Sequence, residues 1–191
     1  MATVVVTGGS RGIGAAVVAR YAARGDRVYF LYEKNHEAAR AVSEKTGATR
    51  ICCDVADSGA VAEAFSNIPE VDILVCNAGV CWYGLLTDMP ETAWDRIFAV
   101  NVKGICNCVK AAMPAFLRKH SGSIVTVSSM GGCMQYTHPY IIPSTSSMMR
   151  RSLQRRGTLC CPPSLPLLFS QRSNSPFGAA ITSRRCSVRF L

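Results

Sequence analysis

Short apolar runs alternate with stretches of helical spacing along the first 130 residues. The apolar runs predict five strands, at Thr3–Val6, Val28–Tyr32, Ala48–Cys53, Val71–Cys76 and Ile124–Val127. The stretches between them predict helices at Ala15–Ala23, His36–Thr46, Asp57–Asn67 and about Thr92–His120. The last helix contains Gly104 and Pro114, and we expect the proline to kink it. Alternating strands and helices with right-handed crossovers predict an α/β fold, a doubly wound parallel sheet of order 3-2-1-4-5.

A glycine-rich turn separates the first predicted strand from the first predicted helix. Its spacing is Gly-x-x-x-Gly-x-Gly, with the glycines at Gly8, Gly12 and Gly14. Strand, glycine-rich turn and helix open a dinucleotide-binding βαβ unit, and this turn therefore predicts a Rossmann domain. Glycine lets the backbone turn tightly and approach a pyrophosphate, which the helix N-terminus attracts. The residues expected to bind the cofactor here are Gly8, Ser10, Arg11, Gly12, Ile13 and Gly14.

Composition places the chain among globular proteins and excludes several other classes. It has 191 residues, of which 49% are hydrophobic and 17% charged, enough for one domain with a sizeable core. No apolar run is long enough to cross a bilayer, and no signal peptide is recognisable, which favours a cytoplasmic protein without a membrane partner. The ten cysteines include no Cys-x-x-Cys pair. We expect buried, reduced thiols and no metal site.

The net charge of +9 is divided unevenly along the chain. Residues 1–95 carry all 12 acidic residues and 8 Lys or Arg, whereas residues 96–191 carry 13 Lys or Arg. A basic half of this kind is typical of nucleic-acid-binding tails. The second half contains few aromatic residues and no recognisable binding motif, and we expect no nucleic-acid partner.

The composition changes after residue 132. Residues 134–191 contain eight Arg, ten Ser and six Pro, no Lys and no acid, and show no amphipathic helix. We interpret residues 133–191 as a degenerate, irregular tail that follows a truncated sheet over residues 1–132. A second interpretation is that this tail is translated out of frame. In one shifted frame, the codons of Ser147–Ser152 are compatible with Tyr-Asp-Ala-Ser-Lys, a hypothesis that the coding DNA would test.

Five motifs occur in order through residues 1–132. They are the glycine turn Thr7–Gly14, Asp54-Val55, Asn77-Ala78-Gly79, Asn101-Val102-Lys103-Gly104 and Val127-Ser128-Ser129. In this order and spacing, the segment resembles the short-chain dehydrogenase/reductase family, in its 3-oxoacyl-carrier-protein-reductase-like branch. The resemblance implies an NAD(P)-dependent oxidoreductase that transfers hydride to or from a carbonyl or alcohol. Its implied substrate is a small-molecule carbonyl or a carrier-bound 3-oxoacyl group.

The resemblance also implies a role for each motif residue. Asp54 would accept a hydrogen bond from the adenine amino group, and Val55 would add a backbone contact. Asn77, Ala78 and Gly79 would line the ribose site and brace the sheet. Asn101 would anchor a water in a proton relay, and Ser129 would polarise the substrate carbonyl.

The choice of cofactor depends on the end of the second predicted strand. NAD-preferring relatives tend to carry an acid there, which binds the ribose 2′-hydroxyl. The matching position here is Tyr32, followed by Glu33 and Lys34. Lys34 and Arg11 are two cations suited to a 2′-phosphate, and together they favour NADP, although Glu33 acts in the opposite direction.

The family's proton donor is a tyrosine with a lysine four residues later, about 13 residues after the serine. The residue 13 positions after Ser129 is Ile142. The nearest tyrosines that could donate the proton are Tyr136 and Tyr140, and neither is followed four residues later by a lysine. No lysine occurs after Lys119, and the helix that helps to build the family's homotetramer is not recognisable. Two functions therefore remain open: a reductase using Ser129, Asn101 and Tyr140, and a non-catalytic nucleotide-binding remnant of a truncated or frameshifted reductase.

Overall fold

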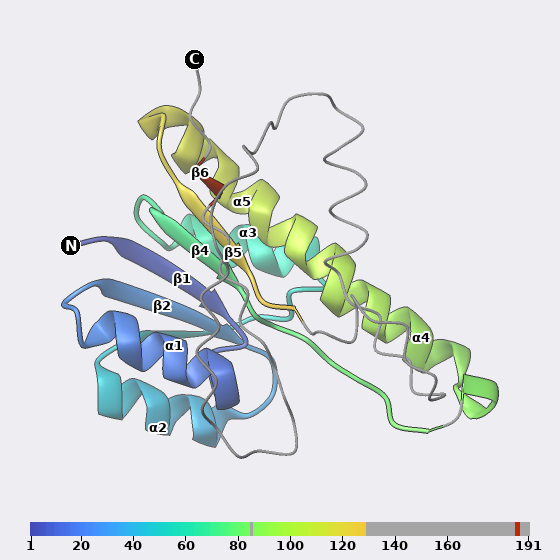
Figure 1. Ribbon diagram of the computed structural model, residues 1–191. Helices are drawn as coiled ribbons and strands as arrows, with labels where there is room; N and C mark the ends of the chain where they lie inside the picture. Colours follow the sequence, from blue (N-terminus) through green and yellow to red (C-terminus); the bar gives the residue numbers. More distant parts are fainter. Residues whose placement is uncertain (85, 129–185, 188–191) are drawn as a thin grey trace, which may run out of the picture.

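The computed structural model describes residues 1–84, 86–128 and 186–187. Within these residues it contains a twisted sheet with helices on both faces (Figure 1). The candidate catalytic residues Ser129, Tyr136 and Tyr140 lie outside the described residues.

The sheet has the strand order β3-β2-β1-β4-β5-β6. Its strands are β1 (Thr3–Thr7), β2 (Arg27–Tyr32), β3 (Thr49–Cys52), β4 (Ile73–Cys76), β5 (Ser123–Thr126) and β6 (Cys186–Ser187). The first five are parallel, which confirms the predicted doubly wound order 3-2-1-4-5. The two-residue β6 pairs antiparallel with β5 and was not predicted, because two residues carry no detectable periodicity.

Helices connect successive parallel strands. They are α1 (Gly12–Ala22), α2 (His36–Thr46), α3 (Ser58–Ser66), the 3₁₀ turn η1 (Leu86–Asp88), α4 (Glu91–Phe98), the π-helical segment η2 (Ala99–Lys103) and α5 (Gly104–Lys119). The predicted long helix is thus interrupted by a π-helical turn, and Gly104 begins α5 instead of lying inside one helix. The helix continues through Pro114 to Lys119. None of the helices within the described ranges has both the length and the hydropathy needed to span a bilayer.

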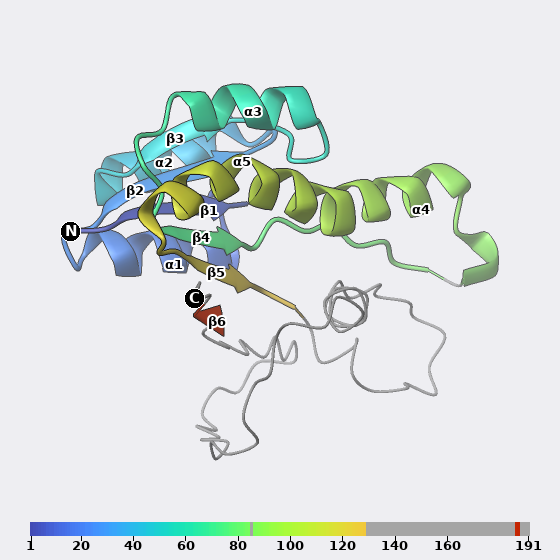
Figure 2. The ribbon, with the colours of Figure 1, turned by 90° about the horizontal axis from the view of Figure 1, so that it is seen from above.

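The side chains of β1 divide the core into two layers. Val5 packs with residues of α3 and α5, whereas Val4 and Val6 pack with residues of α1 and α2. All three valines are fully buried, as expected for a central strand covered on both faces. Figure 2 shows α3 and α5 above the sheet and α1 below it.

The cysteines differ from the expectation of uniformly buried thiols. Cys53, Cys76 and Cys108 are buried, and burial raises the pKa of the Cys53 thiol to about 11, so it stays protonated and packs as an apolar group. Cys52, Cys81 and Cys106 are exposed. The expectation was therefore wrong for Cys52, Cys81 and Cys106, because the apolar runs that carry cysteines also contain surface positions.

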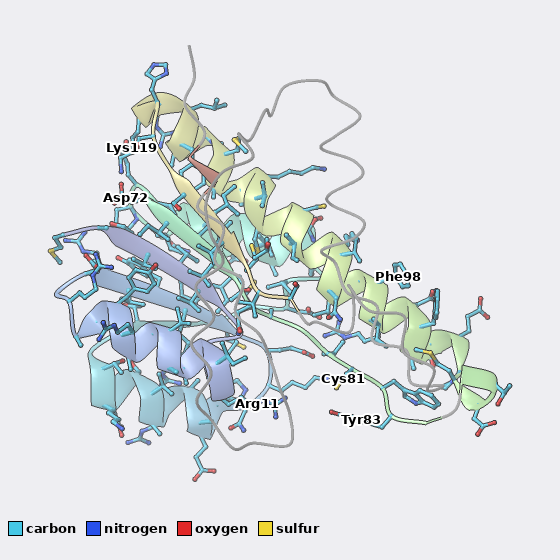
Figure 3. All side chains as sticks on the ribbon, viewed as in Figure 1. Arg11, Asp72, Cys81, Tyr83, Phe98 and Lys119 are labelled. Carbon is cyan, nitrogen blue, oxygen red and sulfur yellow. The ribbon has the colours of Figure 1, made fainter. Side chains whose placement is uncertain are left out.

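Asp72 joins three strands at the amino end of the sheet. Its Oδ2 accepts a hydrogen bond from the backbone N–H of Thr3 at 2.7 Å, and its Oδ1 accepts one from Nζ of Lys119. Its backbone N–H donates to the Thr3 carbonyl, and its carbonyl accepts from Ser123. Figure 3 shows Asp72 and Lys119 at the end of the molecule opposite Arg11.

These contacts predict how stability depends on pH. Burial raises the pKa of the Asp72 carboxyl, but the hydrogen bonds from Lys119 and Thr3 outweigh burial and hold the pKa below its usual value. The charged Asp72 carboxylate therefore stabilises the folded state above about pH 4. This stabilisation is lost as the pH falls through the lowered pKa of Asp72. Between about pH 5 and pH 2, we expect the free energy of unfolding to fall less steeply in Asp72→Asn than in the wild type.

Urea unfolding at several pH values measures this slope. Asp95→Asn is the matched control, because Asp95 is an exposed aspartate on α4. Equal slopes for the wild type and Asp72→Asn would contradict the role assigned to Asp72.

Candidate functional site

A pocket lies where the parallel strands end. It has a volume of about 600 Å³ and is formed by the residues that follow the carboxyl ends of β1, β2, β3 and β4. This edge of a doubly wound sheet, at the switch between β1 and β4, is the usual ligand site of such folds. Twelve of the thirteen residues expected to bind the cofactor line it: Gly8, Ser10, Arg11, Gly12, Ile13, Tyr32, Lys34, Asp54, Val55, Asn77, Ala78 and Gly79.

The glycine turn has the backbone conformation that its sequence predicts. Gly8 and Gly12 have φ values of +67° and +54°, a region that favours glycine. A Cβ on Gly8 would lie 2.9 Å from the Cα of Ala78, so Gly8 is required for close packing. A Cβ on Gly12 would meet no atom within 4 Å, so this position faces the open pocket.

Gly14 does not line the pocket. A Cβ there would lie 2.1 Å from the carbonyl oxygen of Gly8 and 2.6 Å from Nδ2 of Asn77. Gly14 therefore lets α1 approach the turn closely, and it shapes the pocket from behind.

Thr7 fixes the end of β1 to the end of β4. Its Oγ1 accepts hydrogen bonds from the backbone N–H groups of Asn77 and Ala78, both at 2.9 Å. Asn77 Nδ2 donates in return to the carbonyl oxygens of Thr7 and Gly8, at 3.1 and 3.2 Å. Thr7 was not among the expected site residues. Thr7 lies next to the glycine turn. A threonine at this place in the sequence does not by itself show that its hydroxyl accepts two hydrogen bonds from residues about 70 positions later, after β4.

The N-terminus of α1 suits an anionic ligand. No side chain caps this helix, and its first turn contains no acid. The backbone N–H groups of the first turn and the partial positive charge of the helix therefore face the pocket without a competing carboxylate. Figure 3 shows Arg11, which precedes this helix, on the side of the molecule that also carries Cys81 and Tyr83 after β4.

Glu33, Lys34 and Asp54 also line the pocket, and Arg96 contacts the two acids from behind it. Glu33 and Lys34 follow β2, and their charged atoms lie 2.9 Å apart. Asp54 follows β3, and its Oδ1 accepts a hydrogen bond from the N–H of Ala56 at 2.9 Å. Arg96, on α4, contacts both acids: Nη1 donates to Asp54 Oδ2 at 2.7 Å, and Nη2 lies 2.8 Å from Glu33 Oε2.

The pKa of Asp54 reflects this contact. Burial raises its pKa, but hydrogen bonds from Arg96 and from the Ala56 N–H outweigh burial and hold it below its usual value. Asp54 thus stays charged at neutral pH. A carboxylate has about four acceptor positions, so Asp54 retains capacity for a further donor such as an adenine amino group.

Asn101 is held by both of its amide atoms. Its Oδ1 accepts from the N–H of Val80 at 2.8 Å, and its Nδ2 donates to the Val80 carbonyl at 2.9 Å. Asn101 lies in the π-helical segment η2, an irregularity often found at functional sites. In this structure Asn101 therefore holds the segment that follows β4. Val80 belongs to that segment and lines the pocket. The predicted water relay through Asn101 stays a prediction.

Several pocket residues were missed by sequence reasoning. They are Leu31, Asn35, Cys53, Val80 and Val100, together with Arg96 just behind them. All but Arg96 adjoin an expected site residue, Val100 through Asn101, so these neighbours could have indicated them. Arg96 is 42 residues from Asp54, and no local pattern links the two.

The family model for short-chain dehydrogenases matches residues 2–141. Among curated proteins, the chain is 37% identical over 139 residues to 3-oxoacyl-[acyl-carrier-protein] reductase FabG of Staphylococcus aureus. That alignment covers 68% of this chain and 56% of the relative. A cyclic-di-GMP-binding biofilm dispersal mediator protein of Escherichia coli is 37% identical over 133 residues, with 68% and 54% covered. The chain thus spans little more than half the length of these relatives.

Solved structures show the same similarity. A metagenomic short-chain oxidoreductase in complex with NADP matches with a TM-score of 0.72 and 30% identity. The match covers 81% of this chain and 76% of that structure. With the ordered motifs, the sheet order and the pocket at the carboxyl edge, these similarities show that the chain belongs to the short-chain dehydrogenase/reductase family.

Proposed function

We propose that this chain binds NADP(H) in the pocket at the carboxyl ends of β1 to β4 and uses it to reduce a carbonyl group. The observation that supports this most directly is the turn at the N-terminus of α1. Gly12 faces open space there, and the helix N-terminus carries neither a capping side chain nor an acid. These features favour the binding of a dinucleotide pyrophosphate.

The preference for NADP is supported by the charges around the pocket. Lys34 and Arg11 line it, and Tyr32 takes the position at which NAD-preferring relatives tend to carry an acid. The structure of the metagenomic relative is itself a complex with NADP. When bound, NADPH supplies hydride to the carbonyl carbon, and Ser129 is proposed to donate a hydrogen bond to the carbonyl oxygen.

The substrate is proposed from the relatives. Carrier-bound 3-oxoacyl groups are the substrates named for the Staphylococcus aureus protein, which makes a 3-oxoacyl thioester the first compound to test. A simpler small-molecule ketone is the second.

Nucleotide binding without turnover is a second candidate function. None of the six tyrosines in the chain is followed four residues later by lysine. The pair matters because a nearby cation lowers the tyrosine pKa toward neutrality, and a positioned acid typically accelerates proton transfer by about 10²–10⁴. The pocket for the nucleotide does not depend on that pair, since every residue lining it lies between Gly8 and Val100.

Gly12→Ala tests nucleotide binding. The added methyl group would take up space that faces the pocket, so we expect the dissociation constant for NADPH to rise at least about tenfold. The positive φ should lower the free energy of unfolding by roughly 1 kcal/mol. Isothermal titration calorimetry with NADPH and urea unfolding measure the two effects.

Gly25→Ala is the matched control for Gly12→Ala. Gly25 has a φ of +80° and open space for a Cβ, but it lies in the turn between α1 and β2. We expect a similar loss of stability and unchanged NADPH binding. Equal affinities in Gly12→Ala and Gly25→Ala would contradict the proposed site.

Turnover of a 3-oxoacyl thioester separates the two candidate functions. If the chain is a reductase without a positioned acid, we expect NADPH oxidation about 10²–10⁴ times slower than by the Staphylococcus aureus relative under the same conditions. Replacing Ser129 by alanine should abolish that rate, whereas Ser66→Ala, on α3, should leave it unchanged. NADPH binding with no oxidation above the Ser129→Ala background would establish the second candidate instead.

A further inference from the structure

Arg96 holds two acids that come from different strands of the sheet. Its guanidinium lies 2.8 Å from Glu33 and 2.7 Å from Asp54, so one side chain of α4 joins the ends of β2 and β3. All three side chains are about one-third exposed, and the two acids line the pocket. A planar guanidinium can bind two carboxylates at once, which the single ammonium of lysine does less well.

Glu33 is an acid directly beside Tyr32, the position at which NAD-preferring relatives tend to carry one. It follows Gly12 by 21 residues and comes directly after the strand end, the region from which an acid binds the ribose 2′-hydroxyl in NAD-specific Rossmann domains. An unrestrained carboxylate there would attract the 2′-hydroxyl of NADH and repel the 2′-phosphate of NADPH. The effect of Glu33 therefore depends on what neutralises and orients it.

Arg96 is the less exposed of the two cations beside Glu33. Both cations are within 3 Å of a Glu33 oxygen, but the Lys34 side chain is 84% exposed and that of Arg96 only 35%. Exposed ion pairs are screened by water and are weak, whereas a half-buried guanidinium with a second carboxylate partner has a fixed orientation.

Arg96 also changes the charge of this end of the site. The charged residues that line the pocket are Arg11, Lys34, Glu33 and Asp54, two cations and two acids. Without Arg96, these charges cancel. With Arg96 bound to both acids, the surroundings carry one excess positive charge, which favours the nucleotide that bears the additional phosphate.

We infer that Arg96 is a specificity-determining residue: by holding Glu33 it suppresses an NAD-type contact to the ribose and makes the pocket selective for NADP(H). This inference rests on the proposed function, because it assumes that the pocket binds a nicotinamide dinucleotide. Arg96 acts through Glu33 and is a positioning residue with no contact to the reacting atoms.

The test compares the dissociation constants of NADPH and NADH for the full chain and for Arg96→Gln. We expect the wild type to favour NADPH and Arg96→Gln to reduce the NADPH-to-NADH preference at least about tenfold. The same shift should be seen with 2′,5′-ADP against 5′-AMP, because these fragments contain the 2′ position and lack the nicotinamide. Arg40→Gln is the matched control, since Arg40 forms a 2.7 Å ion pair with Glu44 on the exposed face of α2.

A double variant tests whether Arg96 acts through Glu33. In Glu33→Gln the carboxylate is absent, so adding Arg96→Gln should change the preference by less than about threefold. A structural role of Arg96 alone would lower the affinity for both nucleotides and would not be rescued by Glu33→Gln. If Arg96→Gln does not fold, Arg96→Lys retains the charge but loses the two-pronged contact, and it should show a smaller shift in the same direction.

The outcomes separate this inference from the proposed function. A wild type that binds neither dinucleotide, or that favours NADH, would contradict the proposed function and the inference with it. A wild type that favours NADPH, with the preference unchanged in Arg96→Gln or lost equally in the double variant, would overturn the inference alone.

Discussion

The close approach of the glycine turn to the end of β4 is the constraint on which the site depends. Gly14 lacks a Cβ, and the carbonyl of Gly8 occupies the place where one would be. Thr7 then accepts two backbone hydrogen bonds from the residues after β4, and Asn77 returns two to the turn. Both sides of the switch point are thereby fixed before any ligand is present, so the pocket floor is preorganised.

The same edge of the sheet gathers charge from elements that are distant in the chain. Parallel strands bring their carboxyl ends together, and an acid lies just after each of β2 and β3, Glu33 and Asp54. Two carboxylates at a site for an anionic nucleotide would repel it. Arg96 resolves this conflict from a third element, α4, and the lowered pKa of Asp54 is the electrostatic consequence of that contact.

Much of this arrangement could be predicted from the sequence because the signals are local. The valine run of β1, the glycine spacing and the polar residues at strand ends predict the sheet order and twelve of the pocket residues. The rest depends on distances in space. The bonds to Thr7, the amide pair of Asn101 with Val80 and the contacts of Arg96 join residues 21 to 71 positions apart. The π-helical turn depends on packing that periodicity does not encode.

The proposed nucleotide binding and the proposed turnover have separate structural requirements. The pocket is lined by residues between Gly8 and Val100. Proton delivery requires a group of suitable pKa within hydrogen-bond reach of the substrate, which the family provides from the region after Ser129. A Rossmann unit that folds around β1 and β4 can therefore bind the nucleotide even when the region after Ser129 differs from that of the family. A measurement of nucleotide binding tests the pocket residues, and a measurement of turnover tests the region after Ser129. Both measurements are therefore needed.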